Sequence, residues 1–394
     1  MADRTLRLGA AGLGRGFMLM LPTLAADPRV ELVAAADPRA ASRAQFEQAF
    51  GGVTYDSVEA LCEDPGVDAI YLATPHGFHA AQVVAAARCG KHVLVEKPMA
   101  VTLAECAAMI DATERAGVQL VVGHSHSFDA PYLRTRTHIA AGTFGALRMI
   151  HAFNYTDFLY RPRRPEELDT TRGGGVVFSQ GAHQVDVVRL LGGGRVRSVR
   201  ARTGSWDPAR PTEGAYSAML AFEDGAFATL TYSGYAHFDS DELCDWIGET
   251  GVPKDPARYG AARALLRTAA SPAAEAELKT ARTYGSAQPA TAAPVAHNHF
   301  GVLIASCTGA DLRPTPGGVK IYDDTHAWLD ALPPPAVPRA EVIDELHAAV
   351  VHGIAPLHSG EWAMATLEAC LAIVASSRLD REVTLVHQVA MPPQ

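Results

Sequence analysis

The apolar positions in the first third of the chain follow two alternating periods. Short, almost wholly apolar runs predict strands over residues 6–11, 31–36, 69–73, 92–95 and 119–123. The segments between them carry apolar residues at helical spacing and predict helices over 17–26, 40–50, 58–62, 79–89 and 103–116. Strands that are apolar on both faces and alternate with helices are typical of a parallel sheet covered on both sides. The pattern therefore predicts a doubly wound α/β domain over residues 1–123.

Beyond residue 123 strands follow one another without helices between them. The pattern predicts helices over 132–141 and up to about Leu191, and strands near 146–155, 196–203, 215–222, 226–233, 300–306 and 319–322. Two helices, over 340–352 and 360–378, follow a proline-rich link. Such alternation is typical of a largely antiparallel, open-faced sheet. We expect a second, α+β domain over 124–394 that binds substrate and forms the oligomer.

Residues 238–297 interrupt this second domain with a segment rich in Ala, Pro and Thr. A short helix over 261–268 is the one element that its pattern predicts. We interpret the segment as an insertion that forms a lid or a subunit contact.

Composition narrows the class of protein. With 394 residues, 48% of them hydrophobic and 20% charged, the chain has material for two domains with cores of their own. A net charge of −9 argues against a nucleic-acid partner. The six scattered cysteines suit reduced thiols, the chain enters its first strand at once, and no apolar run looks long enough to span a bilayer. These features predict a cytoplasmic protein without a membrane partner.

A glycine-rich turn follows the first predicted strand. Gly12 and Gly14 would let the backbone approach a pyrophosphate at the N-terminus of the next helix, beside Arg15 and Gly16. Phe17 stands where this fingerprint expects a small residue. Dinucleotide binding and an ordinary glycine turn therefore remain alternatives at this point.

Two charged residues at the end of the second strand bear on the choice of cofactor. Asp37 stands where a carboxylate would hold a ribose 2′-hydroxyl, which favours NAD. Arg39 could instead meet a 2′-phosphate, although Asp37 would repel that group, so NADP is the second choice. A solvated turn with a helix-capping acid is the alternative interpretation.

Two later loops end on the same edge of the predicted sheet. Thr74-Pro75-His76 and Glu96-Lys97-Pro98 each follow a strand, and the carboxyl ends of parallel strands line the ligand crevice. An isolated lysine after a strand is usually a solvated charge. Because three loops converge here, we favour Lys97 as a residue that faces the cofactor and substrate.

In the second domain, Ser179, His183 and Asp186 have spacings that place them on one face of a helix. His183 could take a hydroxyl proton while hydride leaves the same carbon, and a core or capping histidine is the alternative. The histidine pairs at 124/126, 76/79 and 297/299 have no acidic or cysteine ligand at a supporting spacing, so we expect no metal site.

The one basic concentration comprises Arg134, Arg136, Arg161, Arg163, Arg164 and Arg172. Guanidinium groups bind carboxylates in a bidentate fashion, so two or three of these arginines could hold an anionic small-molecule substrate beside His183. A solvated loop that pairs with the neighbouring acidic residues is the alternative for most of them.

Together these motifs resemble the Gfo/Idh/MocA family of oxidoreductases over nearly the whole chain. The matching elements are the Gly12/Gly14 turn, Asp37, Thr74-Pro75 with His79, Glu96-Lys97-Pro98, and the stretch from Gly173-Gly174-Gly175 to His183 and Asp186. The resemblance implies an N-terminal Rossmann domain, an open-faced C-terminal sheet, and a homodimer or homotetramer. It also implies that Lys97 polarises a substrate hydroxyl and that His183 accepts its proton. The family often has an aspartate where this chain has Ser179, which makes a polyol substrate less favoured.

Further stretches are similar to the branch of phthalate 4,5-cis-dihydrodiol dehydrogenases. These are 124–129, 160–165 and Ser179-Gln180. The similarity implies an NAD(P)-dependent dehydrogenase that acts on CH-OH or CH-CH donors, with Ser179, Arg161, Arg163 and His126 at a carboxylated ring diol. A sugar or inositol dehydrogenase and a non-catalytic NAD(P)-sensing protein remain the alternatives.

Overall fold

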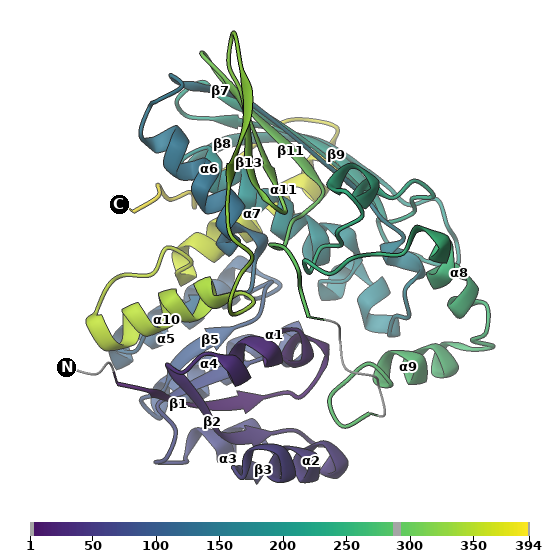
Figure 1. Cartoon of the computed structure of the whole chain (residues 1–394). Coiled ribbons are helices and arrows are strands. Elements are labelled where there is room, and N and C mark those ends of the chain that lie inside the picture. The colour runs from purple at the N-terminus through teal and green to yellow at the C-terminus, as the bar shows by residue number, and fades with distance from the viewer. Residues whose placement is uncertain (1–3, 287–292, 393–394) are drawn as a thin grey trace. The chain divides into compact units, whose positions relative to one another are not determined.

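The computed structural model describes residues 4–286 and 293–392, and the chain divides into two compact units (Figure 1). The first unit contains Met1–His124, Glu277–Ala290 and Val337–Met364. The second contains Ser125–Ala276, Thr291–Ala336 and Ala365–Gln394. The inserted segment and the C-terminal helices therefore contribute residues to both units.

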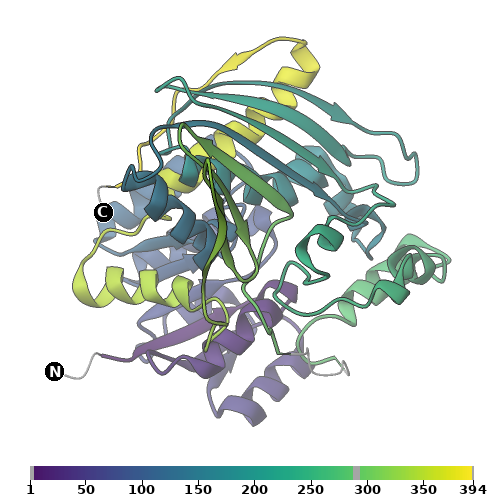
Figure 2. The same cartoon turned by 45° about the horizontal axis from the view of Figure 1, so that its top comes forward.

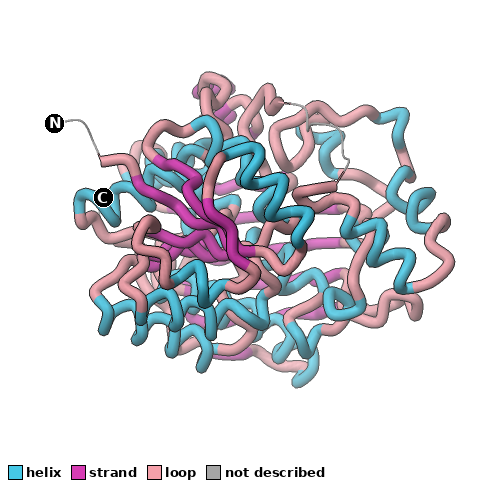
Figure 3. Tube along the Cα trace, turned by 90° about the horizontal axis from the view of Figure 1, so that it is seen from below, coloured by secondary structure: helices cyan, strands magenta, loops and turns pink. Residues whose placement is uncertain are grey.

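The first unit is built on a six-stranded parallel sheet with strand order β3-β2-β1-β4-β5-β6. Its strands are β1 (Leu6–Ala11), β2 (Val30–Ala36), β3 (Val53–Tyr55), β4 (Ala69–Leu72), β5 (His92–Val95) and β6 (Leu120–Val122). Its helices include α1 (Arg15–Ala26), α2 (Ala40–Phe50), α3 (Val58–Cys62), α4 (His79–Arg88) and α5 (Leu103–Ala116). The strands run between helices on either side in Figure 3. This arrangement confirms the predicted doubly wound sheet, and only the three-residue β3 was missed.

Local capping explains where one of these helices begins and ends. Thr102 accepts a hydrogen bond from the amide of Glu105, and the Glu105 carboxylate accepts one from the amide of Thr102. The helix ends at Gly117, which has a φ of +65°. These are the start and stop signals that define α5.

Later parts of the chain complete the first unit. The helix α10 (Ala340–His352) contacts the segment just before β1 through His347, whose Nε2 lies 2.9 Å from the carbonyl oxygen of Arg4. Arg29 forms an ion pair of 2.6 Å with Asp344 of the same helix. The carbonyl of His358 accepts a 2.8 Å hydrogen bond from Val122, at the open edge of β6.

The second unit is built on a nine-stranded sheet with strand order β14-β13-β12-β11-β7-β10-β9-β8-β15 (Figure 2). Its strands are β7 (Leu147–Tyr155), β8 (Val196–Gly204), β9 (Ala215–Phe222), β10 (Phe227–Ser233), β11 (Val302–Cys307), β12 (Asp311–Thr315), β13 (Gly318–Tyr322), β14 (Ala327–Ala331) and β15 (Val383–Thr384). Only β7 and β10 pair in parallel. The predicted open, largely antiparallel sheet is therefore confirmed.

The second unit also contains helices, most of them short, and the site described below uses several of them. They are α6 (Ala130–Ala140), η3 (Phe158–Tyr160), a π-helical turn (Val177–Gly181), α7 (Ala182–Leu191), η7 (Ser240–Cys244), η8 (Pro256–Arg258) and α8 (Ala261–Leu266). The helix α9 (Pro272–Thr280) was not predicted and runs from the second unit into the first. The inserted segment thus has more helical structure than its composition indicates.

One helix corrects the expectation that no apolar run is long enough to span a bilayer. By length and composition, α11 (Gly360–Leu379, 20 residues) passes that test among the described residues. However, 56% of its apolar window is buried inside the protein. The hydroxyls of Ser376 and Ser377 also accept 2.9 Å hydrogen bonds from the amides of Ala201 and Thr203 on β8. These contacts are those of a core helix that covers a sheet.

Candidate active site

The turn after β1 has the geometry of a phosphate cradle. Gly12 has a φ of +84°, and a Cβ at that position would lie 2.9 Å from the carbonyl group of Ala73. A Cβ on Gly14 would meet nothing nearer than the Ala73 oxygen at 3.9 Å, so the space beside Gly14 is open. Gly14 is also the N-cap of α1 and supplies no capping side chain. Uncapped amides and the positive end of the helix dipole fit a pyrophosphate held along Gly12, Gly14, Arg15 and Gly16.

Asp37 and Arg39 form one compact group beside this cradle. Oδ2 of Asp37 accepts hydrogen bonds from the amide of Leu13 at 2.8 Å and from Nη2 of Arg39 at 2.9 Å. Oδ1 accepts two more, from the amide and Nε of Arg39, each at 2.9 Å. A carboxylate has about four acceptor positions, and protein donors occupy all of them. A further donor can therefore bind Asp37 only where one of these four hydrogen bonds is given up.

His79 joins the two loops that follow β4 and β5. Its Nε2 lies 2.9 Å from the carbonyl oxygen of Thr74, and its Nδ1 lies 3.2 Å from the carbonyl oxygens of Pro98 and Met99. Burial lowers the pKa of His79. The side chain is fully buried, so the geometry supports a positioning role for His79, with Thr74, Pro75 and His76 on the loop it holds.

The loop that carries Lys97 is held in place by the buried carboxyl group of the preceding residue, Glu96. Tyr71 on β4 donates a 2.6 Å hydrogen bond to Glu96, and burial raises the pKa of Glu96. A Cβ on Gly16 would lie only 3.4 Å from Cγ of Glu96, which places Glu96 against the start of α1. Lys97 follows directly and precedes a cis peptide bond to Pro98. The structure therefore places Lys97 at the carboxyl edge of the sheet, as predicted.

In the second unit, His183 lies in the first turn of α7, directly after the π-helical turn. The Ser179 hydroxyl lies within that π-helical turn and donates to the carbonyl of Gly175. Asp186 accepts hydrogen bonds from Ser127 and, at 2.8 Å, from Thr366. The spacing argument for Ser179, His183 and Asp186 assumed one regular α-helix. The π-helical turn breaks that regularity. The contacts of Asp186 connect α7 to neighbouring segments and indicate a structural role.

The imidazole of His183 contacts a second imidazole. Its ring centre lies 4.7 Å from that of His126 and 5.2 Å from that of Phe300. Nδ1 of His126 is hydrogen-bonded to Asp129 at 2.6 Å, and Asn298 donates to the other oxygen of this carboxylate at 3.2 Å. Both imidazoles are almost fully buried, and Asp129 holds the ring of His126 in place. The structure thus places the predicted residues His183 and His126 side by side.

A stack of aromatic rings extends from Phe300. Phe300 stacks on Tyr232 with ring centres 6.0 Å apart, and Tyr232 stacks on Tyr216 at 6.1 Å. The Tyr232 hydroxyl shares a 2.8 Å hydrogen bond with Thr156 on the chain that leaves β7. These rings are almost fully buried, so they are core residues packed next to the histidine pair.

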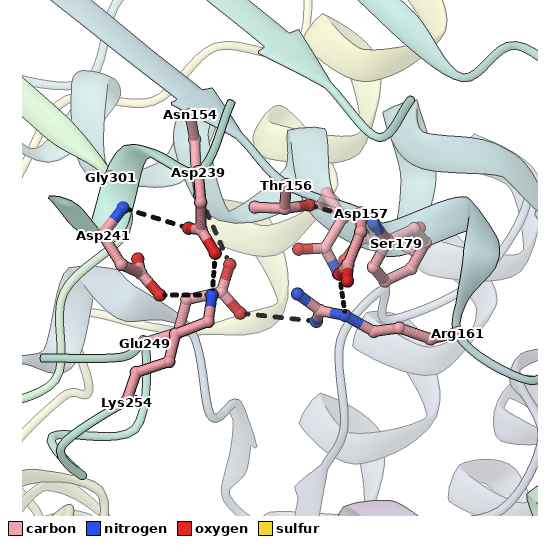
Figure 4. Close-up of polar contacts among 12 residues, drawn as sticks. Asn154, Thr156, Asp157, Arg161, Ser179, Asp239, Asp241, Glu249, Lys254 and Gly301 are labelled. Carbon is pink, nitrogen blue, oxygen red and sulfur yellow. Dashed lines mark hydrogen bonds and ion pairs between the residues drawn. The ribbon is translucent and has the colours of Figure 1, made fainter. Parts of the chain in front are cut away.

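Arg161 belongs to the basic concentration and lies between two carboxylates (Figure 4). Its Nε donates a 3.0 Å hydrogen bond to Asp157, and its Nη1 lies 3.9 Å from Oε2 of Glu249. Its terminal nitrogens donate no hydrogen bond to any residue in the described ranges, and 29% of its side chain is exposed. Burial would lower the pKa of Arg161, but the carboxylates of Glu249 and Asp157 raise it. Arg161 is therefore a permanent cation that can still bind an anion.

Glu249 is a candidate site residue that the sequence did not predict. Its Oε1 accepts a 3.4 Å hydrogen bond from Asn154 at the end of β7. Burial would raise the pKa of Glu249, but the charges of Arg161 and His126 lower it. The loop before it is fixed by Lys254, which binds both Asp239 and Asp241 (Figure 4). The available signal was the run of acidic residues over 239–249, the most polar part of the inserted segment.

Three of the other predicted arginines, Arg163, Arg134 and Arg136, have structural contacts. The guanidinium of Arg163 lies 3.5 Å from the ring centre of Phe158 and donates a 2.8 Å hydrogen bond to the Phe158 carbonyl. Arg134 pairs with Asp330 at 2.6 Å, and Arg136 donates to the Leu191 carbonyl at 3.2 Å. The expectation of two or three arginines around one anion therefore finds its geometric support in Arg161.

Within the described residues, no group of three or more His, Cys, Asp or Glu side chains has the arrangement of a metal site. Backbone carbonyls hold the two histidines of the 297/299 pair, through Pro333 at 2.8 Å and Ile247 at 2.7 Å. The thiols of Cys62, Cys89, Cys106, Cys244 and Cys307 form no disulfide, and Cys89 is the exposed one among them.

A doubly wound sheet with a phosphate cradle, joined to an open sheet that carries a buried histidine pair, defines a nucleotide-dependent oxidoreductase. Residues 6–124 match the family model described as "Oxidoreductase family, NAD-binding Rossmann fold", and residues 132–252 match the GFO/IDH/MocA C-terminal domain. The chain belongs to the Gfo/Idh/MocA family, and it is an NAD(P)-dependent oxidoreductase. The predicted family, enzyme class and NAD cofactor are thereby confirmed.

Known proteins resemble this chain to different extents. A 1-carboxy-3-chloro-3,4-dihydroxycyclohexa-1,5-diene dehydrogenase from Comamonas testosteroni is 47% identical over 373 residues, which cover 94% of each chain. A crystal structure from Bordetella bronchiseptica RB50 has a TM-score of 0.91 at 41% identity and covers 97% of this chain and 100% of its own. A 1,5-anhydro-D-fructose reductase from Ensifer adhaerens is 39% identical over 145 residues, 36% of this chain and 42% of that protein. The similarity to the diene dehydrogenase thus extends over both units.

Proposed function

We propose that this NAD-dependent dehydrogenase oxidises a ring hydroxyl of a carboxylated cyclohexadiene diol. The observation that carries the proposal is Arg161, a cation with unoccupied donors in the same unit as the His183/His126 pair. The name of the Comamonas relative describes a cyclohexadiene with one carboxylate and two hydroxyls, which supports the same substrate class.

In the mechanism that follows, each of three side chains has one task. Arg161 binds the ring carboxylate and orients the diol. Lys97 donates a hydrogen bond to the reacting hydroxyl, and His183 accepts the hydroxyl proton. Gly12, Gly14 and Arg15 would hold NAD, which would supply the hydride acceptor. The product ketone then loses a ring proton and enolises, which restores an aromatic ring and makes the oxidation strongly favourable.

The number of carboxylates separates two members of this substrate class. Phthalate 4,5-dihydrodiol carries two, and would call on a second arginine. The guanidinium of Arg163 is stacked on Phe158 and pairs with Glu167 at 3.6 Å. We therefore favour a monocarboxylate diol, with the phthalate diol as the second substrate to test.

Substitution of Arg161 tests the proposal. We expect Arg161→Ala to raise KM for a carboxylated cis-diol by about 10- to 100-fold, because a charge-assisted hydrogen bond contributes roughly 1.5–3 kcal/mol. KM for a neutral cis-dihydrodiol should change little. Reduction of NAD at 340 nm measures both, and Arg172→Ala, an exposed arginine on the same loop, is the matched control.

The substrate panel also includes myo-inositol and glucose. Preferred turnover of these neutral polyols, or an equal effect of Arg161→Ala on charged and neutral diols, would reject the carboxylate proposal. Tight NADH binding without turnover of any alcohol would instead support the NAD(P)-sensing alternative.

We further propose a homodimer or homotetramer that forms through the outer face of the nine-stranded sheet. This face exposes Met149, Met219, Phe227 and Ile304, and an apolar group of this kind is typical of a protein interface. Light scattering after gel filtration measures the oligomeric state. A cytoplasmic location belongs to the same proposal, since thiols such as those of Cys62, Cys89 and Cys106, which form no disulfide, suit a reducing compartment.

A further inference from the structure

The end of the inserted segment packs onto the cofactor side of the first unit. We call residues 281–286 the strap. The amide of Tyr284 donates a 3.1 Å hydrogen bond to the carbonyl of Leu13, in the glycine turn itself. The carbonyl of Tyr284 accepts a 2.9 Å hydrogen bond from the hydroxyl of Ser42 on α2. Thr283 and Tyr284 are 5% and 6% exposed, so the strap is part of the packed unit.

Two residues are adapted to this close packing. Gly285 has a φ of +86°, and a Cβ there would lie 2.9 Å from Oγ of Ser42. Phe17, the residue that departs from the glycine fingerprint, packs edge-on against Tyr284 with ring centres 5.3 Å apart. A small residue at position 17 would leave Tyr284 without this contact, so the departure and the strap belong together.

The strap completes the hydrogen bonding of Arg39. Nε and Nη2 of Arg39 bind the two oxygens of Asp37, and Nη2 also donates to the carbonyl of Leu13 at 2.8 Å. Nη1 donates to the hydroxyl of Thr283 and, at 3.4 Å, to the carbonyl of Tyr284. A guanidinium group has five N–H donors. All five of Arg39 therefore have acceptors within the first unit, and two of these acceptors come from the strap.

We propose that the strap sets the cofactor preference for NAD over NADP by holding Arg39 on Asp37. The 2′-phosphate of NADP needs guanidinium donors beside the ribose, and Arg39 is the residue placed to offer them. While Thr283 and Tyr284 occupy Nη1, and Asp37 occupies Nε and Nη2, a phosphate can bind Arg39 only by displacing one of these acceptors. Thr283 and Tyr284 are thus positioning residues that act through Arg39.

This inference concerns the first unit alone and does not depend on the identity of the substrate. It also assigns a role to one end of the insertion, for which the sequence suggested a lid or a subunit contact. The strap is 244 residues from Arg39 in sequence at their shared hydrogen bond.

The test loosens the strap by two independent routes. Thr283→Val removes the hydroxyl acceptor at nearly constant volume, and Gly285→Ala forces the strap away from Ser42. Isothermal titration calorimetry with NADH and with NADPH gives the two Kd values without any substrate. We expect the ratio of Kd for NADPH to Kd for NADH to fall about three- to tenfold in each variant, the change that corresponds to one net hydrogen bond.

Two further variants make the result decisive. Ser286→Ala removes the hydrogen bond from the strap to the carbonyl of Thr280, the last residue of α9, at 3.0 Å. It does not touch Arg39 and should leave the ratio unchanged. Adding Arg39→Ala to Thr283→Val should abolish the gain in NADPH binding. Circular dichroism verifies the fold of each variant. An unchanged ratio in folded Thr283→Val, or a gain that persists without Arg39, would overturn the proposal.

Discussion

The two units build their sites in different ways. In the first unit the cradle consists of residues close in sequence, and Asp37 is brought beside it by the pairing of β1 with β2. In the second unit the imidazole pair and Phe300 come from three separate segments, and Arg161 and Glu249 come from two more. The first type of site is encoded in a short motif, since backbone geometry alone creates it. The second type of site depends on the topology of the whole sheet, which brings distant segments together.

The same difference decides where a single substitution can change ligand binding without changing stability. In the first unit, one glycine of the cradle sets the backbone shape and a neighbouring glycine leaves room for the ligand. Substitutions at the two positions should therefore affect the free energy of unfolding and the affinity for NADH separately. In the second unit, residues distant in sequence take part in holding the site, as Asn298 binds Asp129, the carboxylate that holds His126. Substitutions at the reacting groups themselves then give the clearest results.

The largest expected effect is on the chemical step. Lys97→Ala and His183→Ala should each lower kcat by about 10²- to 10⁴-fold, because a positioned acid or base acts mainly in the transition state. Single-turnover kinetics measure hydride transfer, and NADH titration should give an unchanged Kd. His151→Ala, an exposed histidine on β7 bonded to Thr229 at 2.7 Å, is the control. Near-normal turnover in either variant would remove that residue from the mechanism.

The next effect sharpens the contrast within the cradle. Gly12→Ala should lower the free energy of unfolding by about 2 kcal/mol, because it combines a positive φ with a clash against Ala73. Gly14→Ala should change that free energy by less than about 1 kcal/mol, since its Cβ enters open space. It should nevertheless weaken NADH binding about tenfold or more, because the methyl group fills the cradle. Urea unfolding and calorimetry measure the two quantities, and equal stability losses would contradict this division.

The smallest expected effect is a change in pH dependence within the second unit. Burial would lower the pKa of His299, but Cys244, the carboxylate of Asp241 and the carbonyl of Ile247 raise it to about 9. A raised pKa means that the contribution to stability is complete below about pH 6.5 and is lost as pH rises through about 9. Wild-type protein should therefore lose stability between pH 7 and 9.5 more steeply than His299→Gln, by up to about one proton in the linkage slope. Parallel pH profiles from urea unfolding would show that His299 carries no such charge.

The limits of sequence-based prediction follow particular residues. Apart from β3, the strands of the first unit and its helices α1 to α5 were predicted within two residues, because each of these strands is a continuous apolar run. The edge strands β12 and β14 were missed, since β12 contains Pro314 and β14 is largely exposed along its length. Glu249 and the strap could not be assigned, because nothing local in an Ala-, Pro- and Thr-rich segment indicates which distant residues it will contact.

The sequence by itself determined the doubly wound sheet, the glycine cradle, the placement of Lys97 and the family, because periodicity and short spacings encode local backbone geometry. Only the tertiary structure decided which carboxylates hold Arg161 and that Phe17 packs against the strap. Those outcomes depend on hydrogen bonds and packing between residues that are far apart along the chain. Their free energies arise only when the fold brings both partners together.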